Sequence, residues 1–331
     1  MSLPSFTGSL SNFEHYDATR HIGTVFPDKK VRLVDLLKAP NSDVLIKDLA
    51  VLVSQRGVVF FKSQEITVEQ QRQLGQRLGE LTGKPETSKL HRHPLTQNGA
   101  ELGEFVTVIS SNADSFNGRR PEYDAGRASN GWHADITFEP VPSDYAILKI
   151  HTLPETGGDT LFASGYEAYD RLSEPYKKFL EGLTATHSAP CFLEFAKAQG
   201  LEVSPGPRGA PENIGTSLST VHPVIRTNPV TGFKSLFVNK GFTTRINELT
   251  RDESEKVIDF LTGHVAENHD LQVRWRWEKN DIAIWDNRSN FHTATNDYDS
   301  LRVGDRVVSL GEKPFFDPNS KSRREALGLK K

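Results

Sequence analysis

The amino-acid sequence predicts a mainly β domain, a β-sandwich or jelly roll flanked by helices. From about residue 104 onward, short runs rich in β-branched and aromatic residues dominate, whereas helical spacing of apolar residues is found near the start of the chain. Many short strands with few helices are typical of such architectures. The 331 residues contain no internal repeat and no long linker, so the sequence predicts a single domain, 1–331.

The first part of the chain predicts an arm, two helices and a strand between them. Residues 1–30 are rich in Ser, Gly, His and charge, which indicates an extended N-terminal arm. Apolar residues at helical spacing predict a helix over 43–56, and Gly57 ends it. The apolar run 57–62 predicts a buried strand. Thr67, with Gln70 three residues later, predicts the capping box of a helix over 67–79.

The later strands are predicted from runs of β-branched and aromatic residues bounded by polar or turn-forming residues. One of them alternates apolar and basic side chains, as a half-exposed strand does. The predicted strands lie at 105–110, 145–150, 160–162, 235–238, 273–277, 281–285 and 306–310.

Three further segments have their own signatures. Residues 165–183 predict helices, the second beginning near Pro175, where the missing N–H costs little. The density of Gly and Pro in 195–217 predicts a lid or a surface loop. The mildly basic end, 318–331, predicts a solvated C-terminal tail.

The composition is that of a soluble globular protein. The chain is 36% hydrophobic and 25% charged, with a formal net charge of −3. This near-neutral charge argues against nucleic acid as a main partner, because nucleic-acid binding would predict a basic stripe. No segment has the roughly 20 consecutive apolar residues that span a bilayer, and the start lacks a secretory signal. The lone cysteine, Cys191, fits a reducing compartment. We therefore expect a cytoplasmic protein with neither nucleic acid nor membrane as a partner.

A pair of short segments suggests a metal site. His133 and Asp135 stand two apart, so in an extended chain both side chains point to one face. His292 would have to come from another strand folded alongside. Two histidines and one carboxylate form the facial triad that holds Fe(II) and leaves positions open for other ligands. A His-x-Asp pair alone is a weak signal, because most histidines in proteins bind no metal.

Two arginines follow the distal histidine and strengthen this interpretation. If 302–310 is a strand, Arg302 and Arg306 face the same side, because their spacing is even. Guanidinium groups pair bidentately with carboxylates and similar oxyanions. The two arginines therefore predict binding of two anions beside the metal, whereas on their own they would be read as solvated surface residues.

With these residues in place, the chain resembles the taurine/alkylsulfonate dioxygenase family of Fe(II)- and 2-oxoglutarate-dependent oxygenases. The resemblance is carried by motifs that occur in order along most of the chain. They lie at 130–138, 153–164, 222–232, 236–245, 285–292 and 302–311. Ordered blocks of this kind are much more specific than the triad alone.

The resemblance implies a fold, cofactors and residue roles. The implied fold is a double-stranded β-helix, which is cupin-like and agrees with the predicted jelly roll. The implied metal is Fe(II), bound by His133, Asp135 and His292, with 2-oxoglutarate and O2 as co-substrates. Thr160 and Arg302 would hold the distal carboxylate of 2-oxoglutarate. Family members are often dimers or tetramers, so a homo-oligomer is possible.

The resemblance also implies a substrate pocket for a small anionic organic molecule. Arg306 would meet the anionic group, and His93 matches a family histidine that contacts the same group. Phe192 and Phe242 are candidates for the apolar wall. Where the taurine enzyme has a tyrosine and an amine-contacting asparagine, this chain has Thr96 and Ser129. These departures argue against taurine itself.

The sequence therefore predicts a dioxygenase that acts on an alkylsulfonate and releases an aldehyde and sulfite. A carboxylate, an amino acid or a sulfate ester is an alternative substrate, in secondary metabolism for example. Two alternatives come from other classes. They are a non-catalytic jelly-roll binding protein and a zinc hydrolase, since zinc also accepts two histidines and one carboxylate. The Thr160 and Arg302 pair argues against both, because it has no clear purpose without a dicarboxylate.

Overall fold

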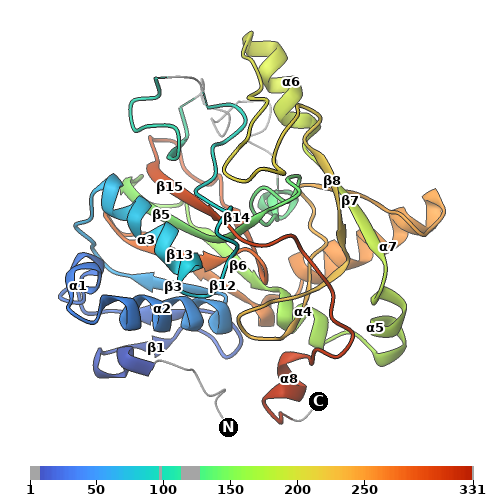
Figure 1. Cartoon of the computed structure of the whole chain (residues 1–331), viewed down its shortest axis with the longest axis horizontal. Coiled ribbons are helices and arrows are strands. Elements are labelled where there is room, and N and C mark those ends of the chain that lie inside the picture. Colours follow the sequence, from blue (N-terminus) through green and yellow to red (C-terminus); the bar gives the residue numbers. More distant parts are fainter. Residues whose placement is uncertain (1–7, 97–98, 113–126, 330–331) are drawn as a thin grey trace.

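The largest element of the fold is a seven-stranded sheet (Figure 1), seen in a computed structural model that describes residues 8–96, 99–112 and 127–329. Strands β2 and β3 pair in parallel, and the other neighbours are antiparallel. In spatial order the strands are β1 (Tyr16–Asp17), β2 (Thr24–Phe26), β3 (Val58–Phe61), β13 (Ile282–Asp286), β5 (Ser143–Thr152), β15 (Val303–Leu310) and β4 (Thr107–Ser110).

Three smaller sheets complete the β structure. Two are three-stranded and one is a two-stranded ribbon. Their orders are β12 (Gln272–Trp275), β6 (Thr160–Ser164), β14 (Asn290–Ala294); then β11 (Thr243–Ile246), β7 (Thr184–Ser188), β8 (Ser219–Pro223); and β10 (Lys234–Leu236), β9 (Ile225–Thr227). In the first of these, His292 of β14 lies opposite Phe162 of β6.

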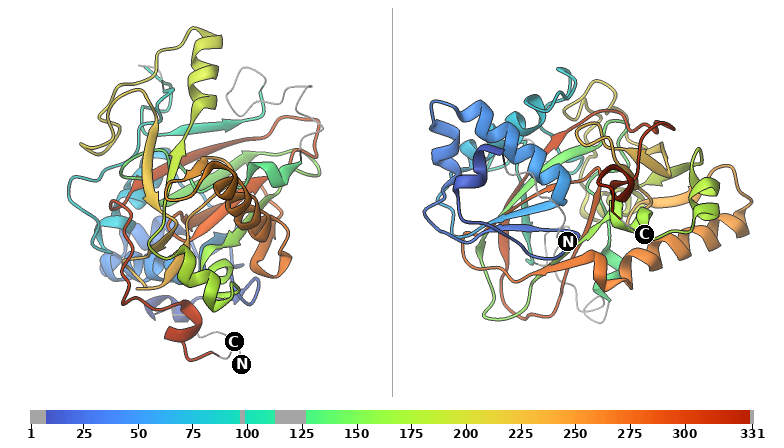
Figure 2. Two further views of the ribbon diagram at one scale, coloured as in Figure 1. Left: turned by 90° about the vertical axis from the view of Figure 1, so that its right-hand side faces the viewer. Right: turned by 90° about the horizontal axis from the view of Figure 1, so that it is seen from below.

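Helices α1 (Leu33–Lys38), α2 (Ser42–Arg56) and α3 (Val68–Glu80) cover one face of the large sheet (Figure 2). Successive side chains of β3 point to opposite faces of the sheet, which explains how the helices pack on one of these faces. Val59 and Phe61 pack in the cluster formed with the helices, whereas Val58 and Phe60 face the interior on the other side. Both faces of the strand are therefore buried, which accounts for its unbroken apolar sequence.

The remaining helices lie around the smaller sheets, and α7 packs against β11. They are α4 (Gly165–Asp170), α5 (Glu174–Leu180), α6 (Pro190–Gln199), α7 (Arg251–Ala266) and α8 (Arg323–Ala326). Short 3-10 helices occupy Gly8–Asn12 (η1), Ala128–Gly131 (η3) and His269–Leu271 (η4). Within the described ranges, no helix is both long and apolar enough to cross a bilayer.

An aromatic core fills the space between the large sheet and the β12-β6-β14 sheet. The ring of Phe60 stacks on Trp275 with centroids 4.0 Å apart, and it meets Phe162 edge-on at 5.6 Å. Trp285 of β13 lies 5.7 Å from Phe162 and 5.0 Å from the ring of His292. The packed core thus ends directly at one of the candidate metal ligands and holds it in place.

Most of the predicted elements are confirmed. The protein is mainly β with flanking helices, the helices predicted over 43–56 and 67–79 are α2 and α3, and Thr67 and Gln70 form the expected capping box. The helices predicted in 165–183 are α4 and α5. Part of the predicted N-terminal arm, Thr24–Phe26, is the fully buried strand β2.

The predicted solvated C-terminal tail is solvated only in part, because Ser322 and Arg323 are buried. Residues 323–326 form α8, which begins with a capping box of Ser322 and Glu325 and packs beside α4. The side chain of Arg323 is buried because it pairs with the buried carboxylate of Glu167 on α4. Basic composition alone did not reveal this internal partner.

Candidate active site

The two histidines of the predicted triad are joined through their backbones. His133 donates its N–H to the carbonyl of His292 at 3.0 Å, and His292 donates back to His133 at 2.8 Å. This isolated bridge replaces the extended strand that we expected for 133–135. The chain turns directly after Asp135, where Ile136 has a φ of 51°.

The three candidate ligands converge on one point. One ligand atom each from His133, Asp135 and His292 lies within 4.8 Å of the other two. The Nε2 atoms of both histidines are 3.9 Å from Oδ1 of Asp135. Among the described residues, this is the one group of three such side chains that could share a metal ion. Two imidazoles and one carboxylate are the donor set that suits Fe(II) with open positions.

Both imidazoles are held in the neutral form that a metal requires. Burial lowers the pKa of His133, and it lowers the pKa of His292 to about 3. Nδ1 of His133 donates to the carbonyl of Gly131 at 2.7 Å, which places the lone pair on Nε2. The donor set and the protonation states therefore both fit a divalent metal.

Asp135 is ionised. Burial alone would raise the pKa of this carboxyl, but the charge of Arg306, with His292 and His133, outweighs burial and lowers the pKa to about 2. NH1 of Arg306 lies 2.6 Å from Oδ1 of Asp135. The carboxylate is therefore charged and ready to ligate across the physiological pH range.

Asn287 fixes the orientation of Asp135. Its Oδ1 accepts from the backbone N–H of Asp135 at 2.9 Å and from Nε1 of Trp285 at 3.0 Å. Its Nδ2 donates to Oδ2 of Asp135 at 3.3 Å and to Ser143 at 2.9 Å. All four hydrogen bonds of the amide are used, so Asn287 holds one carboxylate oxygen and leaves Oδ1 facing the histidines.

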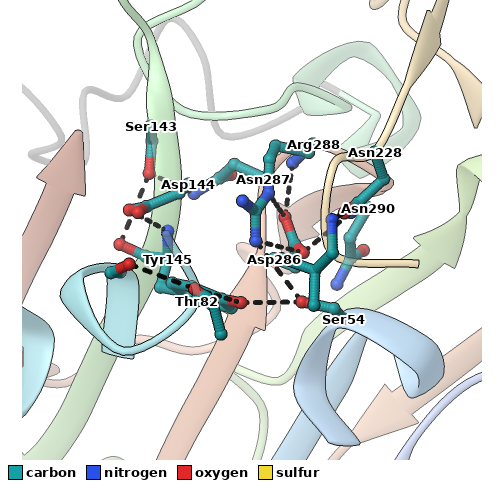
Figure 3. A network of polar contacts seen from close by, with 12 residues as sticks. Ser54, Thr82, Ser143, Asp144, Tyr145, Asn228, Asp286, Asn287, Arg288 and Asn290 are labelled. Atoms are coloured by element: carbon teal, nitrogen blue, oxygen red, sulfur yellow. Dashed lines mark hydrogen bonds and ion pairs between the residues drawn. The ribbon is translucent and has the colours of Figure 1, made fainter. Parts of the chain in front are cut away.

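The turn before β14 rests on a buried ion pair. Asp286 and Arg288 contact each other through two hydrogen bonds of 2.8 Å (Figure 3), and both are buried. Arg288 also lies over the ring of Tyr145 at 4.6 Å. The pair shapes the turn at 287–288 that leads into β14, the strand that carries His292.

A cavity of about 270 Å³ opens beside the triad. Its described lining contains two arginines and no carboxylate. The lining residues are Ile109, Ser110, Ser111, His133, Leu148, Thr160, Trp285, His292, Ala294, Asn296, Tyr298, Arg302 and Arg306. The structure therefore brings both predicted arginines and Thr160 to the same cavity as the two histidines, and its charge favours anions.

Thr160 and Arg302 form a preorganised donor pair in this cavity. Oγ1 of Thr160 accepts from Nε1 of Trp277 at 3.0 Å and from NH2 of Arg302 at 3.3 Å. Both lone pairs are then occupied, so the hydroxyl proton is free to be donated to a ligand. Arg302 is 4% exposed and has no carboxylate partner within the described ranges. A buried guanidinium without a counter-ion is costly and favours an anionic ligand.

Gly158 makes room for this arginine. Its φ is 70°, and a Cβ at this position would lie 2.9 Å from Cδ of Arg302. The carbonyl of Gly158 accepts from Nε of Arg302 at 2.8 Å. The Gly-Gly pair before β6 therefore allows the backbone to approach the guanidinium and fix its direction.

One hydrogen-bond donor of Arg306 is unpaired among the described residues. Its Nε is buried without a hydrogen-bond partner among the described residues, while NH1 contacts Asp135. An unsatisfied buried donor costs about 1–3 kcal/mol. An oxyanion in the cavity would satisfy it.

His93 and the two predicted phenylalanines lie in an aromatic cluster next to His133, although none of them lines the 270 Å³ cavity. Phe192 is 4.9 Å from the ring of His93, and Phe242 is 5.9 Å from the ring of His133. Phe138 contacts both phenylalanines, at 5.4 and 5.2 Å, and joins the two ends of the cluster. Ser129 is exposed on η3.

His93 is neutral and can donate. Burial lowers the pKa of its imidazole well below the ordinary value. Its Nδ1 accepts from the backbone N–H of Leu95 at 3.3 Å. The proton of the neutral ring therefore belongs on Nε2, where it can be donated to an oxyanion.

The segment predicted as a lid or surface loop is tied to the site through its interior. Its first residues belong to α6, which ends at Gln199. Arg208 is buried and pairs bidentately with Glu139, at 2.5 and 2.8 Å. Glu139 also accepts from His91, and the N–H of Ser204 donates to the carbonyl of Pro94. The loop thus clamps the segments that carry Asp135 and His93.

Several contributing residues were missed from the sequence. Trp277 contacts Thr160 from a position outside the family motifs, whereas Gly158 and Phe138 lie inside those motifs but had no predicted role. Glu139 and Arg208 are far apart in sequence, and a buried ion pair leaves no local signal. The Gly-Gly pair was visible as a motif, but its role depends on a contact with a strand more than a hundred residues away.

Comparison with known proteins places these features in a family. Residues 14–308 match the family model described as "Taurine catabolism dioxygenase TauD, TfdA family". The alpha-ketoglutarate-dependent dioxygenase btcD of Neocamarosporium betae is 46% identical, over 97% of this chain and 97% of that protein. The alpha-ketoglutarate-dependent sulfonate dioxygenase of Saccharomyces cerevisiae is 36% identical, over 87% of this chain and 65% of that protein.

A solved structure supports the same relationship. The crystal structure of a taurine dioxygenase from Burkholderia xenovorans superposes with a TM-score of 0.66 at 26% identity. The match covers 96% of this chain and 93% of that one.

Proposed function

The chain belongs to the TauD, TfdA family and is an alpha-ketoglutarate-dependent dioxygenase that uses Fe(II), 2-oxoglutarate and O2; on that premise we propose that it oxidises a small organic anion, an alkylsulfonate, with release of an aldehyde and sulfite. The observation that carries the proposal is the cavity in which the two histidines of the triad and two arginines meet, with no carboxylate among its described lining residues.

The triad of His133, Asp135 and His292 would hold the iron. When bound, Fe(II) supplies the oxidation of a substrate C–H bond by O2, coupled to conversion of 2-oxoglutarate to succinate and carbon dioxide. The protein contributes orientation. Asn287 and the carbonyl of Gly131 fix two of the three ligands, and the aromatic core behind Trp285 fixes the third.

Thr160 and Arg302 would bind the distal carboxylate of 2-oxoglutarate. The free hydroxyl proton of Thr160 and the guanidinium of Arg302 would both be donated to this carboxylate. This contact would set which end of the co-substrate faces the metal, and a fixed orientation keeps the reacting atoms in a productive geometry.

Arg306 and His93 would bind the anionic group of the primary substrate. Arg306 offers its unpaired Nε–H, and His93 offers Nε2–H from the other side of the aromatic cluster. Phe192 and Phe242 would cover the carbon chain. A sulfonate has three acceptor oxygens for these donors, and the yeast relative is named a sulfonate dioxygenase.

Ammonium-bearing substrates such as taurine fit the site less well. The described lining of the cavity has no carboxylate to pair with an ammonium group. Ser129, which replaces the amine-contacting asparagine, is exposed on η3. We therefore place the substrate among alkylsulfonates without an amino group.

Succinate formation tests the proposal. The anaerobically iron-loaded protein would be given 2-oxoglutarate and air with a panel of alkylsulfonates, sulfate esters, aryloxy-acids and amino acids, while sulfite is assayed in parallel. Succinate and sulfite produced together from one sulfonate are the expected result. Succinate stimulated only by a carboxylate would retain the reaction and refute the sulfonate.

Two variants separate the roles of the arginines. Arg306→Gln is expected to raise the KM for the primary substrate and to leave the KM for 2-oxoglutarate nearly unchanged, whereas Arg302→Gln should do the reverse. The matched control is Arg276→Gln, an exposed arginine on the surface. Equal effects of Arg306→Gln on both constants would refute its assignment as the substrate anchor.

We also propose that the facing sheets form a double-stranded β-helix, because the β12-β6-β14 sheet packs across an aromatic core from the large sheet. A cytoplasmic site of action and a homo-oligomeric state are part of the same proposal, supported by the lone exposed cysteine, Cys191, and by the usual behaviour of the family. Size-exclusion chromatography with light scattering would test the oligomeric state.

A further inference from the structure

A second cavity, of about 240 Å³, lies where α4, α8 and the N-terminal segment meet, as the neighbouring positions of α4 and α8 in Figure 1 indicate. It shares no described lining residue with the cavity beside the triad. Basic side chains dominate its wall. The lining consists of Arg20, His21, Glu167, Arg171, Arg323, Arg324 and Leu329.

The charges around this cavity do not cancel. Among the described lining residues, four guanidinium groups face one carboxylate, that of Glu167. Arg171, Arg323 and Arg324 all contact that single carboxylate. Two further carboxylates contact residues of the lining. Asp170 accepts a hydrogen bond from the backbone N–H of Arg324, and Asp270 forms an ion pair with Arg171. Even with both counted, positive charge remains in excess.

Two of the arginines have unused donors. Arg323 is 2% exposed, and its Nε is buried without a hydrogen-bond partner among the described residues. Arg20 lines the cavity with an exposed side chain and has no acidic partner in the part of the chain that the structure describes. An unpaired buried donor and an unpaired guanidinium on one wall are both satisfied by the same kind of ligand, an oxyanion.

We propose that this cavity is a binding site for a small tetrahedral oxyanion of the phosphate type, either free or as a phosphate monoester. Planar guanidinium groups match the oxygens of such a group with paired hydrogen bonds. Because the wall is built from α4, α8 and residues 20–21, the bound anion would also fasten the C-terminal helix to the body of the protein. The site is independent of the proposed substrate.

Calorimetric titration with inorganic phosphate tests the site. The full-length protein would be loaded with Fe(II) and saturated with 2-oxoglutarate under anaerobic conditions, so that Arg302 is occupied, and ionic strength would be held constant with chloride. A second arm would replace phosphate with glycerol phosphate, which distinguishes a free anion from a monoester. Thermal unfolding with and without phosphate gives an independent readout.

Three variants locate the binding. Arg20→Gln removes a charge that makes no ion pair within the described ranges, so the fold should not change, and it is expected to weaken phosphate binding about tenfold, as for one hydrogen bond to a charged group. Arg276→Gln, the matched control on the surface, should bind like the parent protein. Arg306→Gln should also bind normally, because that arginine lies in the other cavity.

The alternative outcomes are distinct. Absence of saturable binding across the millimolar range for both ligands would overturn the proposal. Binding that survives Arg20→Gln but is lost in Arg306→Gln would overturn it as well, since the anion would then occupy the substrate site. Equal weakening by Arg20→Gln and Arg276→Gln would show a general charge effect rather than a site.

Discussion

Replacing Thr160 by Val removes a single hydroxyl from the proposed 2-oxoglutarate site with little change in volume. In the parent protein this oxygen accepts from Trp277 and Arg302, and its proton would be donated to the distal carboxylate. A hydrogen bond to a charged group contributes about 1.5–3 kcal/mol. We therefore expect Thr160→Val to weaken 2-oxoglutarate binding by roughly 10- to 150-fold.

The assay is calorimetric titration of the anaerobic iron-loaded protein with 2-oxoglutarate. The matched control is Thr262→Val on α7, which also removes a buried hydroxyl, one that donates to a backbone carbonyl at 2.8 Å far along the chain from the cavity. The control should keep the affinity of the parent protein. If Thr160→Val binds 2-oxoglutarate as tightly as Thr262→Val does, the assignment of this hydroxyl to the co-substrate is refuted.

Three further predictions concern residues around the site. Asn287→Leu should weaken Fe(II) binding about 10- to 100-fold, because Asp135 loses its orienting partner; an unchanged metal dissociation constant would contradict this. Arg208→Met should lower the free energy of unfolding by about 3–5 kcal/mol, because Glu139 is left as a buried charge without its ion-pair partner. The double variant with Glu139→Leu should recover most of that loss. Chemical denaturation measures both variants, and no recovery in the double variant would argue against an ion-pair effect. Burial lowers the pKa of His222 to about 3 in the folded protein. As the pH falls below about 6.5, this histidine binds a proton in the unfolded chain but not in the folded protein, so the free energy of unfolding falls by about 1.4 kcal/mol per pH unit. His222→Gln should narrow the difference in unfolding free energy between pH 7 and pH 5 by about 2 kcal/mol, and an unaltered pH slope would exclude the residue as a source.

The sequence predicted the elements whose signals are local. The capping box of Thr67 and Gln70, the period of α2 and the apolar runs of β3 and β13 each depend on neighbours within a few residues. Residue types and even spacing suggested the triad and the arginine pair, and the ordered family motifs made that interpretation specific. Their convergence on one cavity agrees with that interpretation.

The features that were missed depend on partners distant in sequence. The C-terminal segment is basic and reads as solvated, but Arg323 and Arg324 find a buried carboxylate on α4. The 195–217 loop is rich in Gly and Pro and lies largely at the surface, and the sequence did not reveal that Arg208 fastens it to Glu139 from within. The extended conformation expected for His133–Asp135 fails because only one residue pairs with β14 before the chain turns. Long-range ion pairs and single-residue bridges leave no periodic trace in a sequence.

The reciprocal bridge between His133 and His292 means that the metal centre links two segments that are distant in the sequence. It joins segments separated by about 150 residues, as the 152-residue separation of Asp135 and Asn287 illustrates. A metal held by such distant ligands cannot bind the unfolded chain in the same way, so its binding free energy is also folding free energy. At a free metal concentration one hundred times the dissociation constant, this linkage would add about 2.7 kcal/mol to stability. The lifetime of the protein in a proteolytic environment should therefore follow the supply of iron, even when no substrate is being turned over.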